Sequence, residues 1–320
     1  DLGGSDFNIT DSLTDVLTFL KSTDEDDVAI LDAAKGINLT DFGPVTLTVD
    51  DAELLVSHSV TSQDGYNIND SASEIQEQIA SAENIGVLGD ALSVNVQPPS
   101  LDAPHVLELT IEEFKAINGE SSALQGLYEI NDIGSAIQAA IGSENQSILN
   151  AASEIAVESG SVKLDLDKFQ SLGDLFEDKG DLVLEDSSTV FDFNPGIDLT
   201  GVGTVRLKAT ENGDDLRDAI EHSGADEVVL GDFTGVVITV DQAKAVTLTG
   251  DGSFAIKDTA SKVRALEGDV DNEHLLAAAA TVTASDASFE DAIHFTQADG
   301  MYDNPSVALK IELGDNASTK

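Results

Sequence analysis

Two kinds of short segment alternate along this chain, and their near-constant separation is the feature that most limits how it can fold. The first kind, which we call the L-T-V-D segment, occurs at residues 45–55, 107–117, 162–172 and 236–246, with a broken copy from Val307. The second kind, the I-x-D-S segment, occurs at residues 9–16, 68–75, 130–137, 184–191 and 256–263. From the third residue of each complete L-T-V-D segment to the first residue of the next I-x-D-S segment there are 21, 21, 20 and 18 positions. Unrelated apolar runs would not keep this spacing, so the chain is predicted to consist of copies of one unit.

Each segment joins a strand signal to a helix signal. In the L-T-V-D segments, alternating apolar residues precede a capping box, in which Thr110 faces Glu113 and Thr239 faces Gln242. In the I-x-D-S segments a recurring Asp ends the strand and is expected to N-cap the helix that follows. It stands at Asp70, Asp132, Asp186 and Asp258. If the strands stack, the same aspartates could instead form a metal ladder.

Further elements lengthen the unit and divide the chain. Short Val/Ile/Leu runs that end in Asp, Gly or Ser predict additional strands at residues 37–43, 85–91, 155–161 and 228–235. Two matching segments, 216–220 and 289–293, predict an extra strand and helix in the second half. The glycine-rich stretch 191–204 interrupts the pattern and predicts a break or bend. The chain then reads as a first repeat array at 1–190, the break at 191–204, and a second array with longer repeats at 205–320.

Short strands that lead into short capped helices at a fixed period favour parallel pairing of equivalent strands. One unit cannot cover both faces of its sheet, so neighbouring units must do so. The predicted fold class is therefore α/β, as a repetitive solenoid-like β/α array with parallel strands and short capped helices, or as two tandem β/α arrays. Because the register starts and stops within a unit, we expect the chain to be a piece of a longer array.

The charge of the chain excludes some partners. The 61 acidic residues and 15 Lys+Arg give a net charge of −46, which argues against nucleic acid and anionic membrane surfaces. No apolar run reaches the length of a membrane span, so membrane insertion is not expected. The chain has no Cys, which rules out disulfides and thiolate chemistry. The acidic surface fits a calcium-loaded secreted protein, a halophile's adaptation to salt, or a strongly repulsive soluble surface.

Calcium is the leading hypothesis for a bound cofactor, because calcium binds six to eight oxygen ligands with several carboxylates among them. The candidate ligands lie in two acidic clusters and are Asp269, Asp271, Glu273, Asp214 and Asp215. The first cluster is not an EF-hand, because His274 and Ala280 occupy the positions that require Gly and Glu. The alternative is that all these acids are helix caps or solvated surface.

The sequence offers little support for catalysis. No G-x-S-x-G motif occurs, and no two of the five histidines have metal-ligand spacing. Pairs of carboxylates are too abundant in an acidic chain to indicate a glycosidase, and the absence of Trp leaves few rings for sugar stacking. We therefore expect a non-enzymatic protein. A polysaccharide-active enzyme on a solenoid scaffold and a halophile-adapted soluble protein are the alternatives.

The best copy of the paired segments, residues 236–263, resembles the acidic repeats of large bacterial secreted and surface proteins, of the giant-adhesin or surface-layer-like class that type I secretion exports. Diverged copies cover most of the chain, although the tandem glycine-aspartate nonapeptides of that class are missing. The resemblance implies an extracellular or cell-surface location and a role as spacer, self-assembling unit or adhesive module, often bound to calcium. The implied partners are other copies of the chain or cell-surface polysaccharide.

Overall fold

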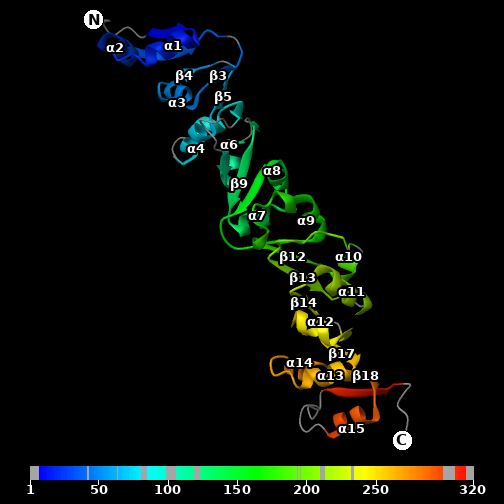
Figure 1. Ribbon diagram of the computed structural model, residues 1–320. Coiled ribbons are helices and arrows are strands. Elements are labelled where there is room, and N and C mark those ends of the chain that lie inside the picture. Colours follow the sequence, from blue (N-terminus) through cyan, green and yellow to red (C-terminus); the bar gives the residue numbers. More distant parts are fainter. Residues whose placement is uncertain are drawn as a thin grey trace. The chain divides into compact units, whose positions relative to one another are not determined.

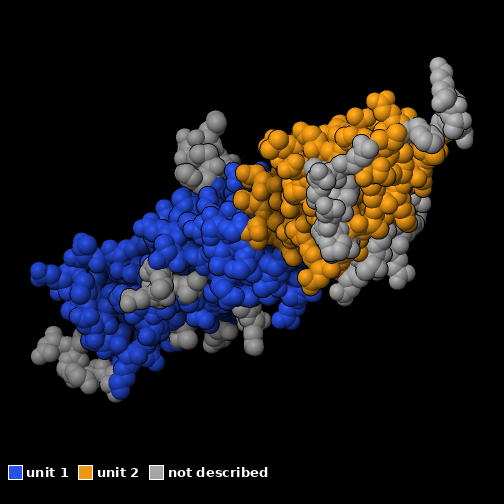
Figure 2. Space-filling model, turned by 90° about the horizontal axis from the view of Figure 1, so that it is seen from below, with its two compact units in different colours: residues 1–160, 175–177 blue, residues 161–174, 178–320 orange. Residues whose placement is uncertain are grey.

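In the computed structural model, the described residues form a mixed α/β protein whose paired strands all run parallel (Figure 1). The description covers residues 7–41, 43–62, 64–80, 85–98, 106–118, 123–192, 194, 196–209, 213–231, 234–297 and 307–314. The chain divides into two compact units, which Figure 2 colours separately. Unit 1 contains residues 1–160 and 175–177, and unit 2 contains residues 161–174 and 178–320.

Unit 1 contains three sheets. Sheet A has the order β1 (Phe7–Asp11), β2 (Ala34–Leu39), β4 (Val60–Thr61). Sheet B has the order β3 (Val45–Leu47), β5 (Tyr66–Asp70), β6 (Ser93–Val96), β8 (Ala123–Gln125). Sheet C has the order β7 (Leu107–Leu109), β9 (Tyr128–Asp132), β10 (Glu154–Val157), with a bridge from Ile155 to Phe176.

Unit 2 contains two sheets. Sheet D has the order β11 (Val162–Leu164), β12 (Leu182–Ser187), β13 (Thr204–Lys208), β14 (Glu227–Val229), β16 (Thr247–Thr249). Sheet E has the order β15 (Thr234–Ile238), β17 (Ser253–Thr259), β18 (Thr281–Ala287), β19 (Ala308–Leu313).

Short helices connect the strands in both units. Those of unit 1 are α1 (Leu13–Leu20), α2 (Glu25–Ala33), α3 (Val49–Ser57), α4 (Ala72–Ala80), α5 (Ile85–Gly89), α6 (Ile111–Ile117), α7 (Gly134–Ala140) and α8 (Gln146–Ala151). Those of unit 2 are α9 (Leu166–Leu172), α10 (Ser188–Asp192), α11 (Gly213–Ser223), α12 (Val240–Ala245), α13 (Ala260–Glu267), α14 (His274–Ala278) and α15 (Phe289–Gln297), with a 3-10 turn at Lys179–Asp181. A second 3-10 turn, Gly173–Leu175, includes residues of both units.

The spacing of the sequence segments is the strand register of the fold. The residue pairs that define the spacing lie opposite each other on neighbouring parallel strands: Leu47 with Ile68, Leu109 with Ile130, Leu164 with Leu184, and Ile238 with Ile256. The sequence had suggested that equivalent strands pair with one another, but in the structure they do not. Each of the four complete L-T-V-D segments instead has its strand at the edge of a different sheet, beside its own I-x-D-S strand, while β19 of the broken copy is the other edge of sheet E.

Glycines with positive φ mark most of the places where the chain leaves one sheet for the next. They are Gly43, Gly65, Gly126, Gly160, Gly231 and Gly250. At Gly126, between β8 and β9, φ is 113° and a Cβ would lie 2.8 Å from the Val96 carbonyl oxygen. Only glycine fits this combination of backbone angle and close approach.

The core of each sheet consists of the apolar residues that alternate along the strands. In sheet C, Leu109, Ile130 and Ile155 are almost fully buried, and in sheet D the same is true of Leu184 and Leu207. Burial of one such side chain contributes about 1.5–3 kcal/mol. On sheets C and D the opposite face carries charged residues such as Glu129 and Arg206, whose positions are a direct result of the period of two.

Several expectations about elements can be compared with the structure. Helices are present at both extra segments, as α11 and α15, and strands at three of the four additional sites, as β2, β10 and β14. The strand predicted at 85–91 is wrong: Ile85–Gly89 is helix α5, and the strand follows as β6. A short apolar run does not distinguish a strand from a buried helix. Across the break predicted at 191–204, β12 pairs directly with β13, so the sheet continues there.

Candidate functional site

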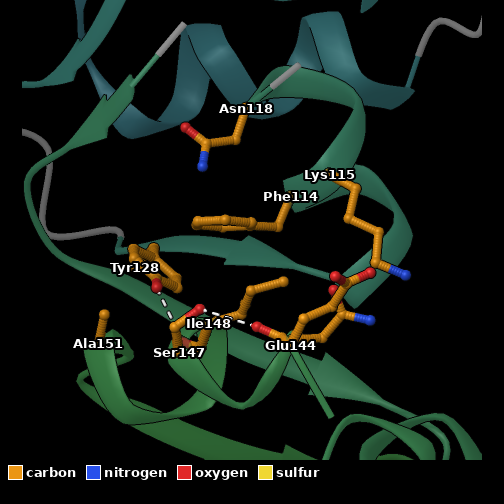
Figure 3. A pocket seen from close by; sticks show the side chains of 9 residues that line it. Phe114, Lys115, Asn118, Tyr128, Glu144, Ser147, Ile148 and Ala151 are labelled. Atoms are coloured by element: carbon orange, nitrogen blue, oxygen red, sulfur yellow. Dashed lines mark hydrogen bonds between the residues drawn. The ribbon is translucent and has the colours of Figure 1, made fainter. Parts of the chain in front are cut away.

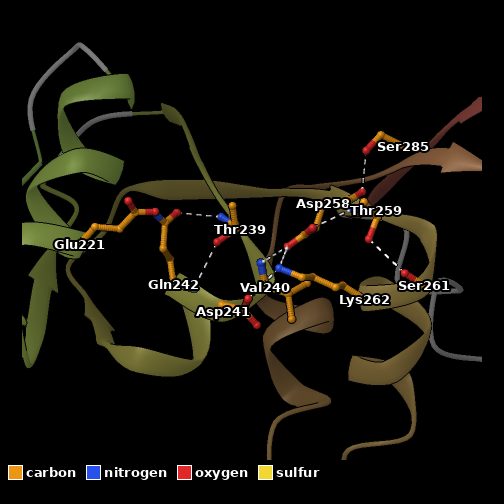
Figure 4. A network of polar contacts seen from close by, with 10 residues as sticks. All are labelled: Glu221, Thr239, Val240, Asp241, Gln242, Asp258, Thr259, Ser261, Lys262 and Ser285. Carbon is orange, nitrogen blue, oxygen red and sulfur yellow. Dashed lines mark hydrogen bonds and ion pairs between the residues drawn. The ribbon is translucent and has the colours of Figure 1, made fainter.

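Asp258, at the end of β17, accepts hydrogen bonds from backbone amides of two different elements (Figure 4). One carboxylate oxygen accepts from the amide of Val240, the first residue of α12, at 3.1 Å. The other accepts from the amide of Thr259 at 2.8 Å. The ammonium of Lys262 lies 3.7 Å from Asp258 Oδ2 and 2.6 Å from Asp241 Oδ2. Both oxygens of the Asp258 carboxylate are thus engaged within the fold.

The same arrangement recurs at the other three aspartates of this position. One oxygen accepts from the first amide of an earlier helix: Asp70 from Val49 at 2.9 Å, Asp132 from Ile111 at 3.0 Å, and Asp186 from Leu166 at 3.1 Å. The other oxygen accepts from the next amide along the chain at 2.8, 2.8 and 2.7 Å, respectively. We call this arrangement of Asp70, Asp132, Asp186 and Asp258 the aspartate staple.

The aspartate staple corrects the prediction that these residues N-cap the helix that follows them. The N-cap of α13 is Thr259, and Asp258 precedes it by one residue. Asp258 Oδ2 accepts from the first amide of α12, which is one of the groups that a helix leaves unpaired. The parallel register explains this, because it places the end of each I-x-D-S strand beside the start of the helix that follows its L-T-V-D neighbour.

The staple residues do not form a metal ladder. They lie in four different sheets, B, C, D and E, so they are not neighbours on adjacent strands. The caps expected at the L-T-V-D helices are confirmed, since Thr110 and Thr239 form complete capping boxes with Glu113 and Gln242. The recurring polar groups of the repeat therefore bind the backbone of the chain itself.

The structure places the calcium candidates as follows. Asp269 accepts from Lys244 Nζ at 2.6 Å and from Asn272 at 3.0 Å, and these bonds lower its pKa. Asp271 and Glu273 lie in the turn before α14, with Asp271 exposed. Asp214 and Asp215 lie in the first turn of α11, where the description does not extend to their side chains. Within the described residues, no three His, Cys, Asp or Glu side chains form a group that could hold a metal.

A column of carboxylates on the polar face of sheet C is a feature that the sequence analysis missed. Glu108, Glu129 and Glu154 lie opposite one another on the neighbouring strands β7, β9 and β10. Partial burial, followed by repulsion from Glu154, Glu108 and Glu177, raises the pKa of Glu129. The signal was present in the sequence, because each glutamate stands next to a core residue of the repeat, but the register was needed to align them.

Sheet D carries a mixed column on the corresponding face. Glu185 lies within 3.0 Å of Lys163, Arg206 and Lys208, and Arg206 also lies 2.6 Å from Glu227. Burial alone would raise the pKa of Glu185, but hydrogen bonds from Lys208, Arg206 and Lys163 outweigh it and lower the pKa to about 2. The positive and negative groups of this face neutralise one another.

A pocket of about 410 Å³ lies in unit 1 beside α6, β9 and α8 (Figure 3). The rings of Phe114 and Tyr128 line it, with their centroids 5.0 Å apart and their planes inclined by 42°. The Tyr128 hydroxyl donates to the Ile148 carbonyl oxygen at 2.9 Å, and burial raises the pKa of Tyr128 to about 12. Lys115 and Glu144 stand at the polar side of the pocket.

Tyr66 of β5 occupies the equivalent place in the preceding pair of segments, within unit 1, and its hydroxyl donates to the Val87 carbonyl oxygen at 2.7 Å. The pocket beside it is smaller, about 200 Å³, and Ala52 lines it where Phe114 lines the larger one. Aliphatic side chains such as Leu47 and Leu55 provide much of the remaining wall. The aromatic pair therefore distinguishes the larger pocket from its repeat-related counterpart.

Comparisons with protein families, with curated proteins and with solved structures found no match to this chain. In the described parts of the chain, no helix has both the length and the apolar character that a membrane crossing requires.

Proposed function

We propose that this chain is a non-enzymatic structural or adhesive segment of a bacterial cell-surface or secreted protein, built as a solenoid-like β/α array. The observation that supports this most is the aspartate staple. This polar arrangement recurs at four positions of the chain, where it binds backbone amides and closes the start of the L-T-V-D helix. A repeat that directs its charged groups inward in this way serves to build an array.

The remaining polar faces favour contact with other molecules over chemistry. The strand faces of sheets C and D present columns of charged side chains whose composition changes from one sheet to the next. Such faces suit association with other copies of the chain or with cell-surface polysaccharide, which we propose as the partners. An extracellular location agrees with a net charge of −46 and with the absence of Cys.

Calcium binding is part of this proposal, because a divalent cation would reduce repulsion among the 61 acidic side chains. Thermal unfolding should be followed in buffer with EDTA, with millimolar calcium chloride, and with sodium chloride of matched ionic strength. We expect calcium to raise the midpoint above the sodium control. An unchanged midpoint removes calcium from the proposal, and stabilisation by molar potassium chloride alone favours the halophile alternative.

The partner and the absence of catalysis are tested together. The purified chain is incubated with cell-surface polysaccharide, and its sedimentation with the polymer and the release of reducing ends are measured. Retention, or self-association seen by analytical ultracentrifugation, without new reducing ends is the expected result. Release of reducing ends would replace this proposal with the polysaccharide-active enzyme.

A further inference from the structure

The pocket at Phe114 and Tyr128 combines apolar and aromatic walls with an acidic surrounding. Phe114 and Tyr128 supply two rings, and Ile148 and Ala151 supply aliphatic surface. In Figure 3 the Phe114 ring lies between the Asn118 amide and the Tyr128–Ile148 side of the hollow. The face of an aromatic ring carries partial negative charge, so two inclined rings attract a cation that also has apolar surface.

The ionised groups around the pocket favour a cation as well. Glu144 lines the pocket, and among the described residues its carboxylate has no hydrogen-bond or ion-pair partner. The ammonium of Lys115 is held by Glu112 at 2.7 Å and points away from the two rings (Figure 3). Unit 1 contains 30 acidic residues and only three Lys or Arg, so the field at its surface is strongly negative.

The chain itself contains an example of this kind of contact. Phe169 of α9 stands four residues after its N-cap Asp165, as Phe114 stands four residues after Thr110. The ammonium of Lys179 lies 5.6 Å from the centroid of the Phe169 ring, within the range of a cation–π interaction. The phenylalanine at this repeat position is therefore able to hold an ammonium group.

From the aromatic walls, the acidic surroundings and the Phe169 contact, we infer that the pocket between α6, β9 and α8 binds an organic ammonium group, with quaternary ammonium as the best fit to the two rings. A hard divalent ion is a poor match, because the pocket offers one carboxylate, Glu144, beside two rings. This inference concerns a ligand site and is independent of the structural role proposed above.

Tyrosine signals give a direct test, because the chain has three tyrosines: Tyr66, Tyr128 and Tyr302. With ¹³C-labelled tyrosine, choline is titrated against the full chain at constant ionic strength. The ring signals of Tyr128 should shift and saturate, while those of Tyr66, in the smaller pocket, stay in place. Substitutions Tyr66→Phe and Tyr128→Phe assign the two signals.

The neutral isostere 3,3-dimethyl-1-butanol separates charge from shape and should bind at least about tenfold more weakly than choline. Phe114→Leu should weaken choline binding about tenfold, whereas the matched change Phe169→Leu should leave it unaltered. Lys115→Gln removes a competing positive charge and should tighten binding, and Glu144→Gln should weaken it.

Equal binding of the alcohol and choline, or a Tyr128 signal that moves no more with choline than with sodium chloride, would overturn the inference. Altered Tyr66 signals would show that Phe114→Leu fails to fold. In that case Lys115→Gln, which should tighten choline binding, and Glu144→Gln, which should weaken it, provide the test. Effects of the same sign from both contradict the proposed site.

Discussion

Units 1 and 2 are equally acidic, with 30 and 31 Asp or Glu, but they differ fourfold in basic residues. Unit 1 has three, Lys21, Lys35 and Lys115, and unit 2 has the other 12. The difference is visible where strands meet. On sheet C, Glu129 lies between two other glutamates, whereas on sheet D, Arg206 lies between Glu185 and Glu227.

The basic residues of unit 2 also join successive helices. Lys244 and Asp269 link α12 to the turn after α13, at 2.6 Å, and Arg264 links α13 to Asp291 of α15, at 2.8 Å. In unit 1, Lys115 pairs with Glu112 of its own helix, and Lys21, the C-cap of α1, pairs with Asp51 of α3. The two units thus differ in how many of their carboxylates can pair with a cation: unit 2 has 12 Lys or Arg for 31 acidic residues, and unit 1 has three for 30.

The aspartate staple is common to both units, and its removal has the largest expected effect. Asp132→Ala in unit 1 and Asp258→Ala in unit 2 should each lower the free energy of unfolding by about 3 kcal/mol, because each leaves two backbone amides without a partner. The two residues are matched in their hydrogen bonds, since each carboxylate accepts from the first amide of an earlier helix and from the next amide along the chain. Urea unfolding, with hydrogen exchange to locate the loss, measures both.

Asp→Asn at the same two positions is the control, because it keeps the shape of the side chain and one acceptor oxygen. It should lower the free energy of unfolding by roughly half as much as Asp→Ala. A loss much larger in one unit than in the other would show that the staple depends on the charge scheme around it. A negligible loss in both would contradict the role we assign to it.

Exchange of the central residue should give the column on sheet C the charge pattern of the column on sheet D, and the reverse. Arg206→Glu places a third carboxylate between Glu185 and Glu227 and should destabilise unit 2 by about 2 kcal/mol. Glu129→Arg places a cation between Glu108 and Glu154 and should stabilise unit 1 by about 0.5–1 kcal/mol. Urea unfolding at low and high salt measures both changes, which should shrink at high salt.

The two substitutions are controls for each other, because the expected signs are opposite. If both destabilise by similar amounts, the arrangement of charges on the strands is not what distinguishes the units. Arg206→Gln and Glu129→Gln remove the charge without reversing it and should give smaller effects of the same signs.

A change of pH has the smallest expected effect and again separates the units by sign. The raised pKa of Glu129 means that the folded chain holds this proton more tightly than the unfolded chain. Unit 1 should therefore gain stability as the pH falls through that raised pKa toward the ordinary value of 4.5. The pKa of Glu185 is lowered to about 2, so its contribution is complete above 4.5 and is lost between 4.5 and about 2.

Urea unfolding at successive pH values, with hydrogen exchange to separate the units, measures these trends. Glu129→Gln should reduce the gain in unit 1, where the pKa of Glu74 is also raised, and Glu185→Gln should reduce the loss in unit 2, where the pKa of Asp291 is also lowered to about 2. A wild-type unit 1 that loses stability between neutral pH and 4.5 would contradict the assignment of Glu129.

Local expectations succeeded where the responsible residues are neighbours in sequence. The capping boxes at Thr110 and Thr239 follow from four consecutive residues, and the structure contains both. The run from Ile85 was misjudged because its few apolar residues suit a strand and a buried helix equally. The aspartate staple was missed for a different reason: Asp132 and Ile111 are 21 residues apart, and only the pairing of β7 with β9 brings them together.

By itself, the sequence predicted the recurring segments with their constant spacing, the parallel direction of the strands and the capping boxes of the L-T-V-D helices, because periodic apolar residues and caps act over short distances. The tertiary structure alone decided that each complete L-T-V-D strand lies at the edge of a different sheet and that the recurring aspartates bind the first amide of the helix of an earlier segment. It also decided that glutamates align on sheet C while charges alternate on sheet D. These features depend on which distant residues become neighbours, and hydrogen bonds and charges act only between groups that the fold has brought within a few ångströms.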